Sequence, residues 1–193
     1  MSDKVKFGLS NVHYAIISAV SDDGVPTYAG SWKALPLAVS MTADVDSNSS
    51  AQYADNQKVY ETSSITGASI TLEMSVISDD FKKDVLGYKT CTSGALIQPT
   101  DAVPVRIALA FQIEGDESKT IVHYFNCSVT DPATENANTK TDSVTFSNES
   151  VAITAYPVKF SDNIHYIKQK IKTGDTGFAT FFTDTPALPT IAS

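Results

Sequence analysis

The sequence VRIALAFQIEGDESKTIVHYFNCSV, residues 105–129, contains the clearest structural pattern in this chain of 193 residues. Apolar side chains occupy alternate positions up to Ile113, and the alternation returns from Ile121 onward. Side chains that recur with a period of two lie on one face of a β-strand. The polar connection at 114–119 contains a glycine, so the stretch predicts two antiparallel strands joined by a hairpin loop.

Further strands are predicted on both sides of this pair. Runs of apolar or alternating residues occur at 12–17, 37–45, 70–76, 150–156 and 164–171. Several strands separated by turn residues are typical of an antiparallel sandwich or barrel. The expected fold class is therefore mainly β, an antiparallel β-sandwich or barrel.

One short helix is predicted to flank the strands, at residues 78–86. Ser78 can cap its N-terminus, and two aspartates follow in the first turn, where the helix dipole favours negative charge. Phe81 and Leu86 fall on one apolar stripe at helical spacing. Gly87 can adopt the left-handed conformation that ends a helix.

Two segments do not follow the strand pattern. Residues 46–64 form a long polar stretch with two tyrosines, and residues 175–193 form a tail in which aromatic residues stand among Thr and Pro. Long segments without secondary structure in a compact domain are usually functional or disordered. The expected organisation is a β domain at 1–156, with 46–64 as a long loop, followed by a strand and an extension at 157–193.

The charge balance argues against a nucleic-acid-binding surface. Lys and Arg number 14 against 22 Asp and Glu, which gives a formal net charge of −8. Tight binding to DNA or RNA needs positive charge that displaces counterions, whereas an acidic surface repels a phosphate backbone. Neither a secretory signal nor a membrane-spanning stretch is found, so we expect a protein made and folded in a cytoplasm, without a membrane partner.

Residue patterns for catalysis or cofactor binding are missing from the sequence. It contains no nucleophile elbow, no zinc-protease motif and no phosphate-binding loop. His13 and His123 lie within expected strands and are interpreted as structural. Cys91 and Cys127 stand singly, which does not support a zinc site. We therefore expect no enzymatic activity, no metal site and no cofactor.

An ordered set of short motifs resembles the major tail proteins of bacteriophages with long, non-contractile tails. The first motif is KVKFGLSNVHYA at residues 4–15. The others are YADN at 53–56, FKKDVLG at 81–87, ALAFQIEGD at 108–116 and YFNC at 124–127. The resemblance runs from the N-terminus to about residue 156. Each motif is structural, and the specificity comes from their order.

The resemblance implies a phage tail-tube fold, a β-sandwich with one flanking helix, and a structural protein of the virion assembled in the bacterial host. It implies hexameric rings in which strands of six subunits close an inner barrel, and rings that stack into a tube. The implied partners are further copies of the chain, a tape-measure protein in the lumen, and tail terminator and distal tail proteins at the tube ends. DNA would pass through without specific binding, and the family brings no catalytic residues.

The long stretch at 46–64 is expected to reach an adjacent subunit or ring. Tyrosines are frequent anchors of protein interfaces. The candidate interface residues are Tyr53, Asp55, Asn56, Lys58 and Tyr60.

Two other functions remain open from the sequence. One is the tube protein of a contractile injection or secretion device, which shares this architecture and would be indicated by a neighbouring sheath gene. The other is a monomeric β-sandwich that acts as a binding or decoration module, which would show a stable monomer and exposed aromatic residues on a concave face.

Overall fold

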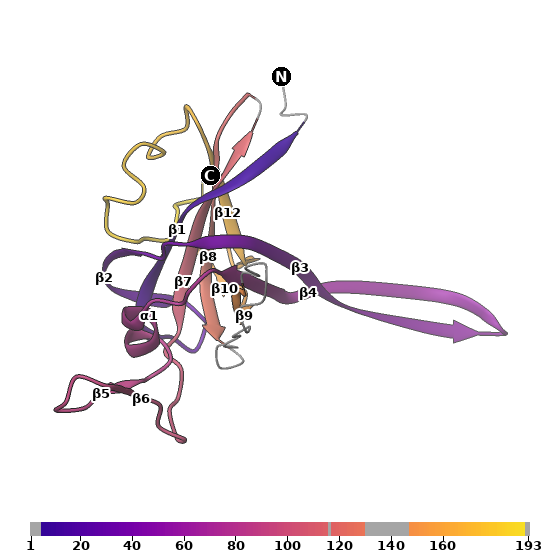
Figure 1. The fold of residues 1–193 in the computed structure, drawn as a ribbon. Helices are drawn as coiled ribbons and strands as arrows, with labels where there is room; N and C mark the ends of the chain where they lie inside the picture. The colour runs from indigo at the N-terminus through magenta and orange to yellow at the C-terminus, as the bar shows by residue number, and fades with distance from the viewer. Residues whose placement is uncertain (1–4, 116, 130–146, 192–193) are drawn as a thin grey trace, which may run out of the picture.

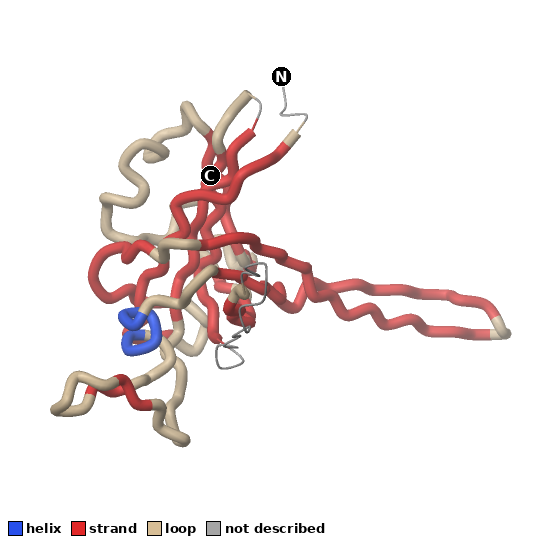
Figure 2. Tube along the Cα trace, in the orientation of Figure 1, coloured by secondary structure: helices blue, strands red, loops and turns tan. Residues whose placement is uncertain are grey.

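Antiparallel strands dominate the computed structural model, which describes residues 5–115, 117–129 and 147–191 (Figure 1, Figure 2). The longer strands are β1 Lys6–Val20, β2 Pro26–Ala34, β3 Ala38–Ala54, β4 Gln57–Met74, β7 Ile107–Gly115, β8 Thr120–Val129, β9 Glu149–Ala155 and β12 Lys168–Lys172. The shorter elements are α1 Asp79–Asp84, β5 Lys89–Thr90, β6 Leu96–Ile97, β10 Val158–Lys159 and β11 His165–Tyr166. The mainly β fold with one short helix is thus confirmed.

Eight of the strands form one antiparallel sheet in the order β2-β1-β7-β8-β9-β4-β3, with β12 paired to β8. One edge of β8 serves two partners, since residues 120–124 pair with β12 and residues 127–129 pair with β9. Strands β10 and β11 form a second small sheet, and β5 and β6 form a third. The hairpin predicted between β7 and β8 is present, although position 116 of its loop lies outside the described residues.

Side chains are buried on both faces of the large sheet. On one face, Leu109 of β7 belongs to a large apolar cluster, called the main core below, which also includes Leu72 and Tyr124. Its neighbours Ala108 and Ala110 point to the other face and pack with Trp32. Helix α1 covers the main core and contributes Phe81, which is fully buried. This double coverage explains why the strand pair at the centre of the sheet has few polar residues.

Helix α1 uses the cap and the terminating glycine that its sequence predicts. The Oγ of Ser78 accepts a hydrogen bond from the backbone N–H of Phe81 at 3.3 Å. Gly87 has a φ of +76°, and the N–H of Tyr88 donates to the carbonyl of Lys82 at 3.1 Å. The regular helix is shorter than the expected 78–86, because Val85 is its C-cap: the N–H of Val85 still donates to the carbonyl of Phe81 at 2.9 Å, and the chain turns away after it.

We expect Ser78→Ala to lower the free energy of unfolding by about 1 kcal/mol, because the N–H of Phe81 loses its acceptor at a half-buried position. Urea unfolding followed by circular dichroism measures the change. Ser78→Thr, which keeps the acceptor oxygen, is the matched control and should stay close to wild type. An unchanged unfolding midpoint for Ser78→Ala would contradict this role of the cap.

The expectation of a long loop at 46–64 is wrong, because these residues continue β3 and β4 as an antiparallel hairpin. The register pairs Ser49 with Ser63 and Ala54 with Gln57. The tip is the two-residue turn Asp55-Asn56, whose φ values of +51° and +61° are those of a type I′ turn. Both faces of this hairpin carry mainly polar side chains. Apolar residues therefore do not recur at every second position, and the sequence gives no signal for strands here.

Other boundaries also differ from the expectation. The run at 164–171, expected as a single strand, divides into β11 and β12, which belong to different sheets. Strand β2 has no apolar alternation, since only Pro26 and Trp32 are buried along it, and the sequence did not predict it. The final residues, 175–191, contain turns but no strand, and they lie against the sheet face that carries Trp32.

Candidate functional site

The hairpin of β3 and β4 projects far from the rest of the molecule (Figure 1). Every side chain from Ser47 to Thr66 is exposed. Strand β4 pairs with β9 only from Ala68 onward, so the projecting part of each strand pairs with the other strand of the hairpin alone. The hairpin therefore presents two faces and two edges to its surroundings.

All five candidate interface residues lie at the tip of this hairpin. Asp55 and Asn56 form the turn, Tyr53 pairs across the strands with Lys58, and Tyr60 pairs with Gln52. The two tyrosines are 66% and 64% exposed, which is unusual for side chains of this size. The tip thus combines aromatic side chains with charged ones and can serve as a contact surface.

A groove of about 240 Å³ opens at the base of the hairpin. The hairpin contributes Val45 and Ile65, which are 53% and 61% exposed, and the body contributes Tyr124, Ile167 and Lys168. The sequence did not predict this groove, because its lining comes from strands that are distant along the chain. The only hint in the sequence is that Val45 and Ile65 are apolar residues at the ends of a polar stretch.

A stripe of lysines extends along β12 from the groove, and its first member, Lys168, lines the groove itself. The stripe consists of Lys168, Lys170 and Lys172, which occupy alternate positions of β12 and therefore lie on one face of the sheet. This is the face of the main core, because the residues paired with Lys168 and Lys170 are Tyr124 and Val122, which belong to that core. Burial lowers the pKa of Lys170, and the positive charges of Lys6, Lys168 and Lys172 lower it further. The clustering stands out in a chain whose net charge is −8.

The opposite face of β3 and β4 is polar and uncovered. The cross-strand pairs Thr42–Thr71 and Asp44–Ser69 are exposed, and they alternate with the pairs that point into the main core. On the same side of the sheet, the apolar part near Trp32 is covered by Phe181 and Phe182 of the C-terminal segment. One half of this face is therefore closed by the chain itself, and the other half is open.

His123 lies beneath the C-terminal segment and is fully buried. Its Nδ1 lies 3.0 Å from the Nε2 of Gln169, and its ring packs edge-on against Trp32, Phe125 and Phe181 at centroid distances of 5.0–5.5 Å. Its Nε2 has no hydrogen-bond partner among the described residues. Burial lowers the pKa of His123 to about 3, so the ring is neutral at physiological pH. The ring is fully buried and therefore closed to a substrate.

The second expected structural histidine, His13, also packs on the C-terminal segment. Its ring stacks on Phe182 at 4.3 Å, and its Nδ1 lies 2.9 Å from the carbonyl oxygen of Asn11. Cys127 is a buried free thiol, and Cys91 is a half-buried one.

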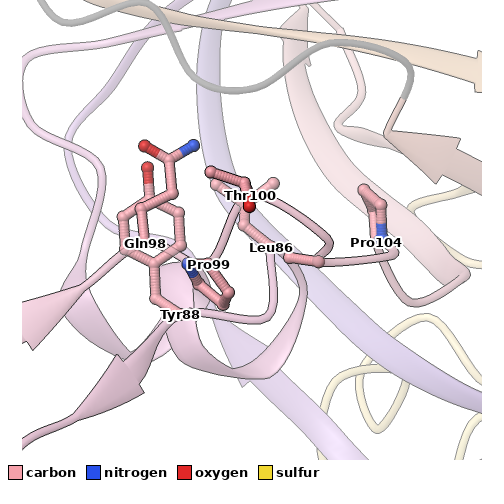
Figure 3. Close-up of a pocket in the computed structure, with 7 residues that line it drawn as sticks. Leu86, Tyr88, Gln98, Pro99, Thr100 and Pro104 are labelled. Atoms are coloured by element: carbon pink, nitrogen blue, oxygen red, sulfur yellow. The ribbon is translucent and has the colours of Figure 1, made fainter.

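A larger hollow of about 500 Å³ lies between the end of α1 and the β5–β6 hairpin (Figure 3). Leu86, Tyr88, Gln98 and Pro99 line it together with Thr100, Ala102 and Pro104. None of these seven side chains is a carboxylate, a histidine or a cation, so the hollow offers no acid–base pair for catalysis. Within the described residues, no cluster of three His, Cys, Asp or Glu side chains could hold a metal ion, and the one helix is too short to cross a bilayer.

Comparison with known proteins gives one family match. The model of the phage tail tube protein family matches residues 3–186, nearly the whole chain, and extends beyond residue 156, where the sequence motifs end. No curated protein shows significant similarity to the chain. Tail tube proteins are non-enzymatic structural components of the virion that self-assemble. The match over residues 3–186 shows that the chain belongs to the phage tail tube protein family.

Proposed function

We propose that this chain forms hexameric rings that stack into the tail tube, the conduit through which the phage genome enters its host. The observation that carries the proposal is the β3–β4 hairpin, which projects away from the rest of the described residues and pairs with none of their strands beyond its base (Figure 1). An isolated two-stranded hairpin is at best marginally stable in water. Contacts with further copies of the chain would supply the packing that this hairpin lacks.

Open strand edges support the same conclusion. Strands β2 and β3 form the two ends of the sheet order, and β3 is 17 residues long. Within the described residues, the outer edge of β4 is also unpaired from Gln57 to Thr66. A long unpaired edge is a template for pairing with another chain, and closing identical subunits into a ring removes such edges by symmetry.

The polar face of β3 and β4 is the part of the sheet that we assign to the bore of the tube. Its exposed pairs, Thr42–Thr71 and Asp44–Ser69, carry hydroxyl groups and a carboxylate and no cation. A wall of this chemistry repels a phosphate backbone weakly and offers it no counterion-releasing contacts. DNA could pass such a wall without binding. A tape-measure protein would occupy the same space before ejection, and terminator and distal tail proteins would close the ends.

Electron microscopy and native mass measurement of the purified protein at increasing concentration test this proposal. We expect hollow tubes or rings, and a smallest closed species with six times the mass of the 20.7 kDa chain. A reconstruction of the tubes should place Asp44 and Thr71 on the bore. A protein that stays monomeric at every concentration, even with its tape-measure partner, would overturn the proposal, and a bore lined by other strands would overturn the assignment of the face.

A further inference from the structure

We propose that the groove at the base of the β3–β4 hairpin receives the hairpin tip of a second copy of this chain, and that the lysine stripe of β12 pairs with the carboxylates of that tip. The inference rests on the proposed function, because it names the acceptor for the projecting hairpin. It concerns a specific contact between subunits, so it can fail while tube assembly stands.

The groove exposes apolar side chains of the kind that protein contacts usually bury. Val45 and Ile65 are more than half exposed, although both continue the face that is buried further along the same strands. Ile167 and Tyr124 form the facing wall. A hollow of about 240 Å³ can accept an aromatic side chain, and filling it would remove these apolar side chains from water.

The charges around the groove favour an anionic partner. Among the described residues, no carboxylate lies within ion-pair distance of the side-chain amines of Lys168, Lys170 or Lys172. Lys168 instead donates a hydrogen bond to the hydroxyl of Tyr124 at 3.1 Å, at the groove itself. Burial is the main reason that the pKa of Lys170 is lowered, and repulsion by the neighbouring lysines lowers it further. A carboxylate from another copy would relieve that repulsion.

The hairpin tip has the complementary chemistry. Tyr53, Val59 and Tyr60 are each more than 60% exposed. Asp55 and Glu61 carry negative charge beside them, and Lys58, which pairs with Glu61 at 2.6 Å, offsets only one of the two. Exposed carboxylates also occur at the start of α1, but there the charge of Asp80 is paired with Lys83 and large exposed apolar side chains are not interleaved.

The tip of one copy cannot reach the groove of the same copy. About nine residues of extended strand separate Val45 from the turn, and at roughly 3.3 Å per residue the tip stands about 30 Å from the groove. The contact therefore joins two different patches of two identical chains. Contacts of this head-to-tail kind generate closed rings or continuous stacks, which are the two arrangements that a tube requires.

Nucleic acid fits this surface less well than a second copy. A phosphate backbone would use the lysines but would leave Val45 and Ile65 in water, and the chain as a whole is acidic. An acidic tip with aromatic side chains can pair with the lysines and also cover Val45 and Ile65.

Charge exchange between the two surfaces tests the inference. Lys170→Glu should raise the concentration at which tubes form by about tenfold, because it places like charges opposite each other. Combining it with Glu61→Lys in the same chain should restore assembly to near the wild-type concentration. Lys89→Glu, an exposed lysine on β5 far from the groove, is the matched control and should assemble as wild type does. Circular dichroism and urea unfolding confirm that each variant is folded.

The outcomes separate the two proposals. Normal assembly of Lys170→Glu, or a defect that Glu61→Lys fails to rescue, would overturn the proposed contact while leaving the tube function intact. Unchanged assembly together with loss of binding to double-stranded DNA would assign the lysines to nucleic acid and would equally overturn it. A wild-type chain that never assembles would overturn the tube function and this contact with it.

Discussion

A chain whose hairpin is cut back to its base should fold normally and form no tubes. The variant replaces residues 49–63 with Asn-Gly, so that Asn48 and Ser64, which already pair, flank a two-residue turn. Asn-Gly is the preferred sequence for a type I′ turn, whose twist matches that of the flanking strands. The change removes the tip and most of the projecting strands while keeping the register of the sheet.

The folded body should tolerate this deletion because the removed residues contribute nothing to its core. All of their side chains are exposed, and the pairing of β4 with β9 begins only at Ala68. We expect the free energy of unfolding to change by less than about 1 kcal/mol, as surface changes usually do. Assembly should be lost entirely, because the hairpin is the surface that we propose reaches other copies.

Urea unfolding measures the first expectation, and sedimentation with electron microscopy measures the second. A milder change than the deletion is the double variant Tyr53→Ala with Tyr60→Ala, which keeps the hairpin and removes its exposed rings. Loss of buried aromatic anchors typically costs about 2 kcal/mol or more at an interface, so this variant should need a much higher concentration to assemble. Normal tubes from the shortened chain would show that the hairpin has no role between subunits.

The sequence predicted the central strands well because burial imposes an apolar period on them. The pair within 105–129 lies within two residues of the observed strands. The hairpin at 46–64 escaped prediction for the converse reason. Its side chains are solvated on both faces, so no apolar pattern marks its strands. Their register follows from the pairing of the buried parts of β3 and β4. Asp55-Asn56 was the one local turn sequence.

The sequence predicted a candidate surface only where the residues that form it are close together along the chain. The tip residues are close in sequence, and the exposed aromatics that suggested an interface are indeed together at one end of the hairpin. The groove depends on the register that brings Ile65 close to Ile167, and no pattern within either segment specifies that register. Phe181 of the C-terminal segment packs on Trp32 and His123, and these partners could not be identified without the fold.

His123 should make the folded chain lose stability as the pH falls below about 6.5. Burial lowers the pKa of this ring from 6.5 to about 3 in the folded chain. Between these two values the unfolded chain binds a proton that the folded chain excludes, so the free energy of unfolding decreases by up to about 1.4 kcal/mol per pH unit. The contribution is fully present above pH 6.5 and is lost progressively toward pH 3.

A double variant isolates this effect from the titration of carboxylates. His123→Phe with Gln169→Leu removes the ring nitrogens together with the amide that contacts Nδ1, so that no half-buried amide is left unpaired. Between pH 6.5 and 5.0, the wild type should lose about 2 kcal/mol more than this variant. His165→Gln, at an exposed histidine, should follow the wild-type pH dependence.

The single tryptophan offers a direct readout of the same event. Trp32 packs edge-on against His123 at 5.1 Å and also contacts Phe181 of the C-terminal segment. A proton on His123 would place an unpaired charge among aromatic rings, and the least costly response is for the C-terminal segment to detach and admit water. Trp32 fluorescence should therefore shift to longer wavelength at a higher pH than the loss of β-sheet circular dichroism. The shift should move to lower pH in the double variant, and simultaneous changes of both signals in both proteins would exclude a local release at His123.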